Sequence, residues 1–225
     1  MLCLRHKFIS VRHSGLPSYG GSQMFSENRA MRRCGCGAVS SSDLILYLAK
    51  YHDNCRISTL PPALLADVID EKAYDAFAMS LIKKYMPVIP PFGMNGLTLV
   101  LGLDVFFLRH GIPYRASWGV RRDRLWERIA EMLSADIPVI LSIGPNFPRV
   151  WEKSKASLYR KGTAGELFPA CTVNAHFLTV TGMDGEWLQV SSWGKLFYIS
   201  RKEYEQYVTE HSNGILCSIV SVSHR

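Results

Sequence analysis

Two cysteines lie in residues 32–38 (RRCGCGA), directly before a segment with the pattern of a helix. The nucleophile in thiol chemistry is the thiolate, and a helix N-terminus and nearby cations both lower a cysteine pKa. The glycines on both sides of Cys36 let a substrate backbone approach its sulfur. Because Cys36 rather than Cys34 adjoins the expected helix, we predict that Cys36 is a nucleophile. A buried, inert cysteine beside a turn is the competing interpretation.

A histidine in the second half of the chain supplies a matching base. Residues 174–182 (NAHFLTVTG) predict a strand that begins at His176. After a turn at 183–185, the segment 187–194 (WLQVSSWG) contains a second predicted strand, at 187–191. If the two strands form a hairpin, the serines before Trp193 lie at the same end of it as His176, where one of them can orient the imidazole. A hydrogen-bonded core histidine at a strand start is the competing interpretation.

Three polar residues are candidates for orienting that imidazole. Ser191 and Ser192 face opposite sides of a strand, so only one of them can point at His176. The spacing to Trp193 favours Ser191. Asp184 is a weaker choice, because it sits in the turn at the far end of the hairpin.

The elements that must position these side chains fall into two groups. Residues 44–49 (LILYLA) are apolar on every side, which predicts a helix buried in the core. Further helices are expected at about 61–85, 95–111 and 121–133 and from Arg201, strands at 137–143, 176–181, 187–191, 196–199 and 214–222, and a polar, loop-rich segment at 144–168. Helices cluster in the first half and antiparallel strands in the second, which favours an α+β class over alternating α/β.

We therefore expect a single domain over residues 1–225, with an irregular lead-in at 1–25 rich in Gly, Ser and Pro. Its N-terminal helical half, with the buried central helix, should pack on the C-terminal antiparallel sheet.

Together these residues resemble the papain-like cysteine peptidase superfamily. Residues 34–36 (CGC) are similar to the papain Cys-Gly-x-Cys run with one residue missing, and residues 190–194 (VSSWG) are similar to its Asn-Ser-Trp-Gly run. The chain is more similar to the bacterial bacteriocin-processing (double-glycine) peptidase-like group, in which Cys-Gly and small residues open a helix. A later segment of that group reads His-x-x-x-Val-x-Gly-x-Asp-Gly, here residues 176–185. The resemblance covers roughly 28–60 and 170–210, and it implies a papain-like fold and a peptide or amide substrate.

The resemblance also implies a side-chain amide that stabilises the oxyanion. In that family a glutamine precedes the nucleophile by a few residues. Ala30 occupies that place relative to Cys36, and Asn28 occupies it relative to Cys34. Gln23 is the glutamine of this region, and it would need a longer loop to reach the sulfur. Asn28 and Gln23 are therefore both candidates.

The composition narrows the remaining classes. The net charge of +7 and the pI of about 9.2 suit an acidic partner, but the basic residues are scattered and accompany no nucleic-acid module, so nucleic acid is not favoured. No apolar run is long enough to span a bilayer and no signal peptide is evident, so we expect a cytoplasmic protein. Six irregularly spaced cysteines do not form a disulfide framework. Nothing indicates a cofactor or an oligomeric state.

Three functions fit these residues. In the first, Cys36 attacks a peptide or amide carbonyl, as a thiol hydrolase or acyltransferase, while His176 takes and returns the proton. Backbone N–H groups, with Asn28 or Gln23, would hold the oxyanion. In the second, a catalytically inactive papain-like domain binds a peptide or a partner, because the usual glutamine and the usual orienting Asn or Asp are absent. In the third, Cys34, Cys36 and a histidine bind zinc or copper, although no second cysteine pair supports this site.

Overall fold

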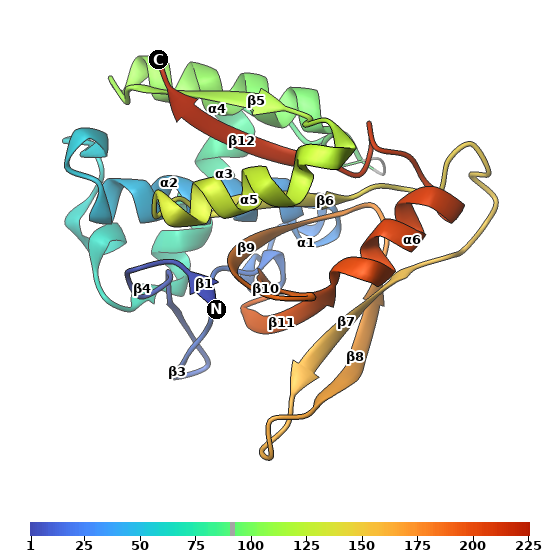
Figure 1. Ribbon diagram of the computed structural model, residues 1–225. Coiled ribbons are helices and arrows are strands. Elements are labelled where there is room, and N and C mark those ends of the chain that lie inside the picture. The colour runs from blue at the N-terminus through green and yellow to red at the C-terminus, as the bar shows by residue number, and fades with distance from the viewer. Residues whose placement is uncertain (91–92) are drawn as a thin grey trace.

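The computed structural model describes residues 1–90 and 93–225, and its helices and large antiparallel sheet confirm the predicted α+β class (Figure 1). Within these residues the α-helices are α1 (Arg29–Cys34), α2 (Cys36–Tyr51), α3 (Glu71–Lys84), α4 (Gly96–Arg109), α5 (Leu125–Ser134) and α6 (Arg201–His211). The 3₁₀ helices are η1 (Gln23–Phe25), η2 (Asp53–Cys55), η3 (Pro62–Leu65) and η4 (Arg122–Arg124).

The strands of the described residues are β1 (Leu2–Cys3), β2 (Val11–His13), β3 (Leu16–Pro17), β4 (Ile69–Asp70), β5 (Tyr114–Trp118), β6 (Val139–Ile143), β7 (Ala156–Lys161), β8 (Leu167–Val173), β9 (His176–Asp184), β10 (Trp187–Ser192), β11 (Lys195–Ser200) and β12 (Ile219–His224). The large sheet runs in the order β5-β12-β6-β9-β10-β11-β7-β8, with β1 added to β9. Its neighbouring strands all pair antiparallel. β9 therefore lies in the interior of the sheet, whereas β8 and β5 end it.

Helix α2 is the central helix that the sequence predicted. Every residue from Gly37 to Ala49 is buried, as expected for a segment that is apolar on nearly all sides. The helix packs against β9 and β6 of the sheet and against α3 and α4 of the helical half. Figure 1 shows α2 behind β6 and β9, with α5 in front of them. The first turn of α2 is thereby held against the beginning of β9.

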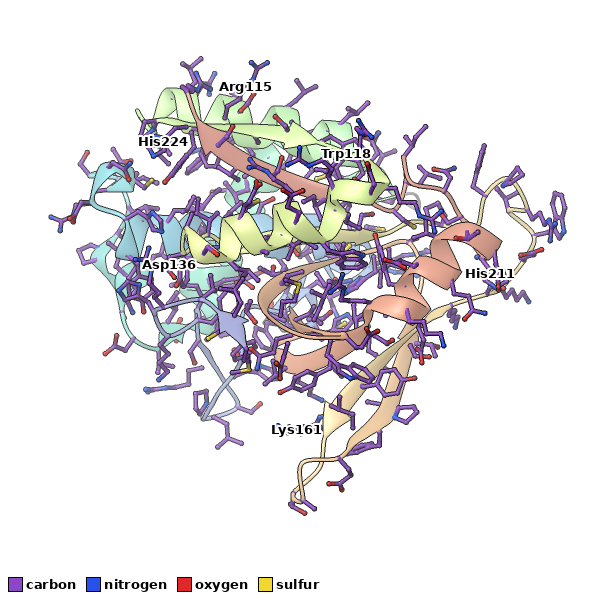
Figure 2. All side chains as sticks on the ribbon, viewed as in Figure 1. Arg115, Trp118, Asp136, Lys161, His211 and His224 are labelled. Atoms are coloured by element: carbon purple, nitrogen blue, oxygen red, sulfur yellow. The ribbon has the colours of Figure 1, made fainter. Side chains whose placement is uncertain are left out.

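The first 25 residues contain more regular structure than the expected irregular lead-in. Strand β1 extends the sheet through Cys3, which lies opposite Gly182, and β2 pairs with β3 and β4 in a small second sheet. The buried carboxylate of Asp136, labelled in Figure 2, accepts the Arg5 backbone N–H at 2.7 Å and the Tyr47 hydroxyl at 2.7 Å. These hydrogen bonds hold the N-terminal residues 1–25 against α2 and against the end of α5.

The segment at 144–168 was expected to be loop-rich, and this expectation is wrong for its second half. Strand β7 and the start of β8 form a hairpin that projects from the sheet (Figure 1). Only the first part of β7 alternates between buried and half-buried side chains, and β8 is mostly exposed. The period-two signal of a strand is therefore weak in this part of the sequence.

Candidate active site

Cys36 is the first residue of α2, and a tight connection from α1 places it there. Gly35 joins the two helices, and a Cβ at Gly35 would lie 2.2 Å from the Met31 sulfur, so only glycine fits this close approach. Cys34 ends α1 and is buried, whereas Cys36 is half-buried and lines a cavity. The structure thus separates the two thiols, and Cys36 is the one that faces the candidate site.

His176 is the first residue of β9 and is held from two sides. Its Nε2 lies 2.8 Å from the hydroxyl oxygen of Ser192. The indole of Trp193 stacks on the imidazole, with ring centroids 4.7 Å apart and an angle of 25° between the planes. These two contacts fix the plane of the ring and leave Nδ1 as the nitrogen that is available to a reacting group.

The choice of Ser191 as the orienting residue is wrong, because Ser192 makes the contact. A β-bulge shifts the pairing of β9 and β10, so that Gln189 lies opposite Gly182 but Val190 lies opposite Val180. One extra residue in β9 moves the side chains beyond it to the other face. Ser192 consequently shares the face of His176. The hydroxyl of Ser191 instead donates to the Tyr19 carbonyl at 2.8 Å.

Asp184, the weaker choice, is exposed at the far end of β9 and lies 3.5 Å from the N-terminal ammonium group. It does not line the cavity that contains His176.

Trp193 owes its position to an unusual turn. Trp193 and Gly194 connect β10 to β11 with φ values of 49° and 71°, the positive angles of a two-residue type I′ hairpin turn. Glycine adopts such angles readily, but a tryptophan does so at a cost of about 1–3 kcal/mol. Strained residues of this kind cluster at functional sites. Here the turn conformation places the indole on His176.

The candidate groups meet around one small cavity of about 10 Å³. Cys36 of α2, His176 of β9, Ser192 of β10 and Gln23 of η1 all line it. A space of this size holds about one water molecule. The folding of segments distant in sequence therefore brings a thiol, an imidazole, a hydroxyl and an amide together.

Gln23, rather than Asn28, is the amide of this cavity. Its side chain is 8% exposed, and its Nε2 donates one hydrogen to the Arg32 carbonyl at 2.9 Å. An amide nitrogen carries two hydrogens, so a second one is available to an oxyanion. Asn28 is exposed, and its Oδ1 caps α1 by accepting the Met31 N–H at 3.0 Å. Its spacing to Cys34 had made Asn28 a candidate for stabilising the oxyanion, but its side-chain amide caps the N-terminus of α1.

Two glycines explain how Gln23 reaches the cavity. A Cβ at Gly20 would lie 2.1 Å from the Ser191 hydroxyl, and one at Gly21 would lie 2.0 Å from the Tyr74 hydroxyl. Only residues without a side chain can pass between α2 and β10 at this distance. The Gly20-Gly21 pair is therefore the local signal, present in the sequence, that the lead-in enters the core immediately before Gln23.

Burial keeps the thiol and the imidazole neutral. It raises the pKa of Cys36 above its ordinary value, against the opposing effect of the Phe177 and Gly37 backbone N–H groups. Burial also lowers the pKa of His176 to about 4. The sequence favoured a thiolate at Cys36 because of the helix N-terminus and the adjacent arginines. In the folded chain, desolvation of the sulfur outweighs those effects.

Alkylation by iodoacetamide should show this neutral state directly. Because alkylation requires the thiolate, the rate at Cys36 should keep rising with pH beyond the ordinary cysteine range instead of reaching a plateau near pH 6. Cys34 should react more slowly because it is buried. Peptide mapping after timed labelling at pH 6 to 10 gives both rates. A plateau below pH 7 would indicate a thiolate–imidazolium pair, and faster labelling of Cys34 would contradict the assignment of Cys36.

Asp43 is a residue of the cavity that the sequence interpretation missed. It lies two helical turns after Cys36 on α2 and is 1% exposed. The Tyr74 hydroxyl donates to its carboxyl at 2.7 Å, and the Gly21 N–H donates at 3.0 Å. Burial raises its pKa to about 7, against these two hydrogen bonds. An acidic residue seven positions after Cys36, directly before the apolar run at 44–49, was the available signal.

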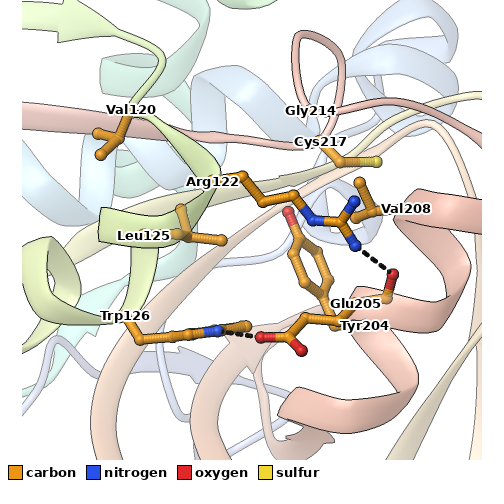
Figure 3. Close-up of a pocket in the computed structure, with 9 residues that line it drawn as sticks. All are labelled: Val120, Arg122, Leu125, Trp126, Tyr204, Glu205, Val208, Gly214 and Cys217. Carbon is orange, nitrogen blue, oxygen red and sulfur yellow. Dashed lines mark hydrogen bonds between the residues drawn. The ribbon is translucent and has the colours of Figure 1, made fainter.

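A second small cavity lies between η4, α5 and α6 (Figure 3). The indole N–H of Trp126 donates to the Glu205 carboxylate, and an Arg122 guanidinium N–H donates to the Glu205 carbonyl. The Tyr204 hydroxyl donates to the Ser142 carbonyl at 3.0 Å. The polar groups around this cavity hydrogen-bond to one another, and these bonds hold α6 against α5 and the sheet. We therefore interpret the cavity as structural.

The comparisons with known proteins leave the family open. No family model matches the chain, and no curated protein and no solved structure matches it. Among the residues that the structure describes, no three His, Cys, Asp or Glu side chains gather into a set that could hold a metal ion. No helix of the described part is both long enough and apolar enough to cross a bilayer.

Proposed function

We propose that this chain is a thiol hydrolase with a papain-like fold, in which Cys36 attacks the carbonyl of a peptide or amide. The observation that carries the proposal is the shared cavity. It is lined by a cysteine at the start of a buried helix, a histidine held by a hydroxyl and an indole, and a side-chain amide. A nucleophile, a base and a group that orients the base are the parts that covalent acyl transfer requires.

In the proposed reaction, the sulfur of Cys36 bonds to the carbonyl carbon while the thiol proton passes to His176. Nδ1 takes this proton because Nε2 already contacts Ser192. The second N–H of the Gln23 amide and the backbone N–H of Cys36 donate to the oxyanion. The tetrahedral adduct then expels the amine, which receives the proton from His176. Water hydrolyses the remaining thioester, with His176 again acting as the base.

The proposal is tested with a diverse synthetic peptide library. The intact protein and its Cys36→Ala variant are incubated with the library, and new termini are identified by mass spectrometry. Cleavage products are expected with the native chain and not with the variant. Cys34→Ala is the matched control, because it removes a thiol outside the cavity, and it should retain cleavage. Products that persist in Cys36→Ala would overturn the proposal.

A second candidate is a papain-like domain that binds peptides without cleaving them. Two observations favour it: both reacting groups are neutral, and a serine contacts the imidazole where the resembled family has Asn or Asp. A hydroxyl stabilises an imidazolium less than a carboxylate does. Peptides that bind the native chain and Cys36→Ala equally, with no new termini from either, would select this candidate.

A further inference from the structure

A groove of about 530 Å³ lies beside the much smaller Cys36 cavity. We call it the hairpin groove, because residues of the β7–β8 hairpin and of the start of β11 line it. Its lining includes Arg160, Phe168, Cys171, Trp193, Lys195 and Phe197. Trp193 also lines the Cys36 cavity, where it stacks on His176. The two spaces therefore share the Trp193 side chain, and a ligand in the groove can contact the residue that stacks on His176.

Three aromatic residues line the groove; Trp193 and Phe168 are partly exposed, whereas Phe197 is buried beneath them. Trp193 and Phe197 meet edge to face, with centroids 6.1 Å apart. Phe168 lies opposite Arg160 in the β7–β8 pairing, and 45% of it is exposed. Partly exposed rings beside a site bind apolar side chains and flat peptide groups, because they bury large area at little entropic cost.

The charged residues of the groove lining are both cations, Arg160 and Lys195. Neither makes an ion pair or a side-chain hydrogen bond with another described residue. Many surface arginines elsewhere do, such as Arg124 with Glu127 at 2.8 Å and Arg149 with Glu152 at 3.0 Å. Two cations without a protein carboxylate beside an apolar surface complement an acidic ligand, and the arginine fork suits a carboxylate in particular.

The strand beside the groove suits an extended ligand. β8 ends the sheet order, so its outer edge pairs with no other strand of the described residues. Exposed strand edges are places where extended peptides lie and hydrogen-bond to the backbone.

We propose that the hairpin groove binds a segment of the substrate peptide that carries an acidic residue next to an apolar one, beside the bond that Cys36 attacks. The position of the bond that is cleaved rests on the proposed thiol hydrolase function. Binding of the peptide in the groove does not depend on that function. A single-stranded nucleic acid also combines negative charge with flat rings. The peptide is favoured because the groove shares Trp193 with the cavity whose proposed chemistry acts on an amide carbonyl.

The binding test uses the Cys36→Ala chain, so that no cleavage intervenes. Paired fluorescein-labelled octapeptides, taken from the library and differing by Glu or Gln at one position beside an apolar residue, are titrated by fluorescence anisotropy. The Glu peptide should bind about tenfold tighter than its Gln partner, as two partly exposed charge contacts allow. The charge reversal Arg160→Glu with Lys195→Glu should remove this preference.

Lys161→Glu is the matched control. Lys161, labelled in Figure 2, follows Arg160 on β7, so its side chain points to the other face of the strand. It does not line the groove. Its reversal changes the net charge without changing the groove, so the Glu preference should persist within about twofold. An equal loss in Lys161→Glu would show a general charge effect and overturn the proposal, as would equal binding of the two peptides.

Two further outcomes separate the proposals. An oligonucleotide that binds the groove more tightly than the Glu peptide, and loses binding in the Arg160→Glu and Lys195→Glu variant, would replace the peptide with a nucleic acid. If the Glu preference holds but the native chain cleaves no peptide, the groove stands and the hydrolase proposal fails. If the native chain cleaves peptides with no acidic preference, and the charge reversal leaves this pattern unchanged, the groove proposal fails alone.

Discussion

Replacing His176 by glutamine is expected to lower kcat/KM for a cleaved peptide by about 10²–10⁴-fold, the usual contribution of a positioned general base. Glutamine keeps a polar side chain of similar length beside Ser192 and Trp193, so the stacked site is disturbed little. The loss should appear in kcat rather than in KM, because in the proposed reaction the imidazole acts on the thiol proton and not on the bound peptide. Steady-state kinetics of the purified variant measures both constants.

Serine variants provide the controls for this result. Ser192→Ala should cost about tenfold, because it frees the ring but leaves the base in place. Ser191→Ala should cost less, since its hydroxyl donates to the Tyr19 carbonyl and shares no contact with the imidazole. In the native chain, kcat/KM should fall with acid only near pH 4, the pKa to which burial lowers His176, and His176→Gln should lack that limb. A native acid limb near pH 6.5 would contradict the buried, neutral imidazole.

Asp43→Asn is expected to change how the stability of the fold depends on pH. The folded pKa of Asp43 is raised from 3.8 to about 7, so between these pH values the folded chain holds a proton that the unfolded chain releases. Stability from this group is complete below about pH 4 and is lost as pH rises to about 7. A shift of this size corresponds to about 4 kcal/mol of unfolding free energy. Asparagine has no such titration, so the variant should gain stability relative to the native chain by up to that amount from pH 4 to pH 8.

Urea unfolding at pH 4, 6 and 8 measures this difference. The lowered pKa of His176 gives the opposite trend, with stability rising from pH 4 to about 6.5. Asp43 is protonated over most of this range, so the trend is nearly the same in both chains and largely cancels in the comparison. Asp67→Asn is the control, because Asp67 is exposed and its pKa is lowered by Lys50. Parallel stability curves for Asp43→Asn and the native chain would show that the Asp43 carboxyl does not titrate in this range.

The charge of Asp43 also bears on the candidate reaction. Asp43 lines the Cys36 cavity from the same helix, and a protonated carboxyl places no negative charge near the sulfur. Ionisation of this group near pH 7 would disfavour a thiolate at Cys36 and support an imidazolium at His176. The pH profiles of the native chain and of Asp43→Asn therefore report on the same site as His176→Gln.

Several features of this protein follow from the sequence alone. The α+β class and the burial of α2 follow from residue patterns that act over one helix or strand: the apolar run at 44–49 predicts a segment that is buried on all sides. The helix expected at about 95–111 is α4, and Asn95 caps its start by accepting the Thr98 N–H at 2.8 Å. The positions of Cys36 and His176 at the starts of their elements are local features of the same kind.

The partners of those two residues were decided only by the tertiary structure. Side chains alternate across a strand, and a bulge shifts this alternation. A single extra residue in β9 therefore places Ser192, and not Ser191, on the face of His176. Gln23 reached the cavity through the close passage at Gly20 and Gly21, which a count of residues before Cys36 does not reveal. The protonation of the site also depends on burial. The helix N-terminus and the arginines are visible in the sequence, whereas the desolvation of Cys36, His176 and Asp43 exists only once α2 and β9 have packed together.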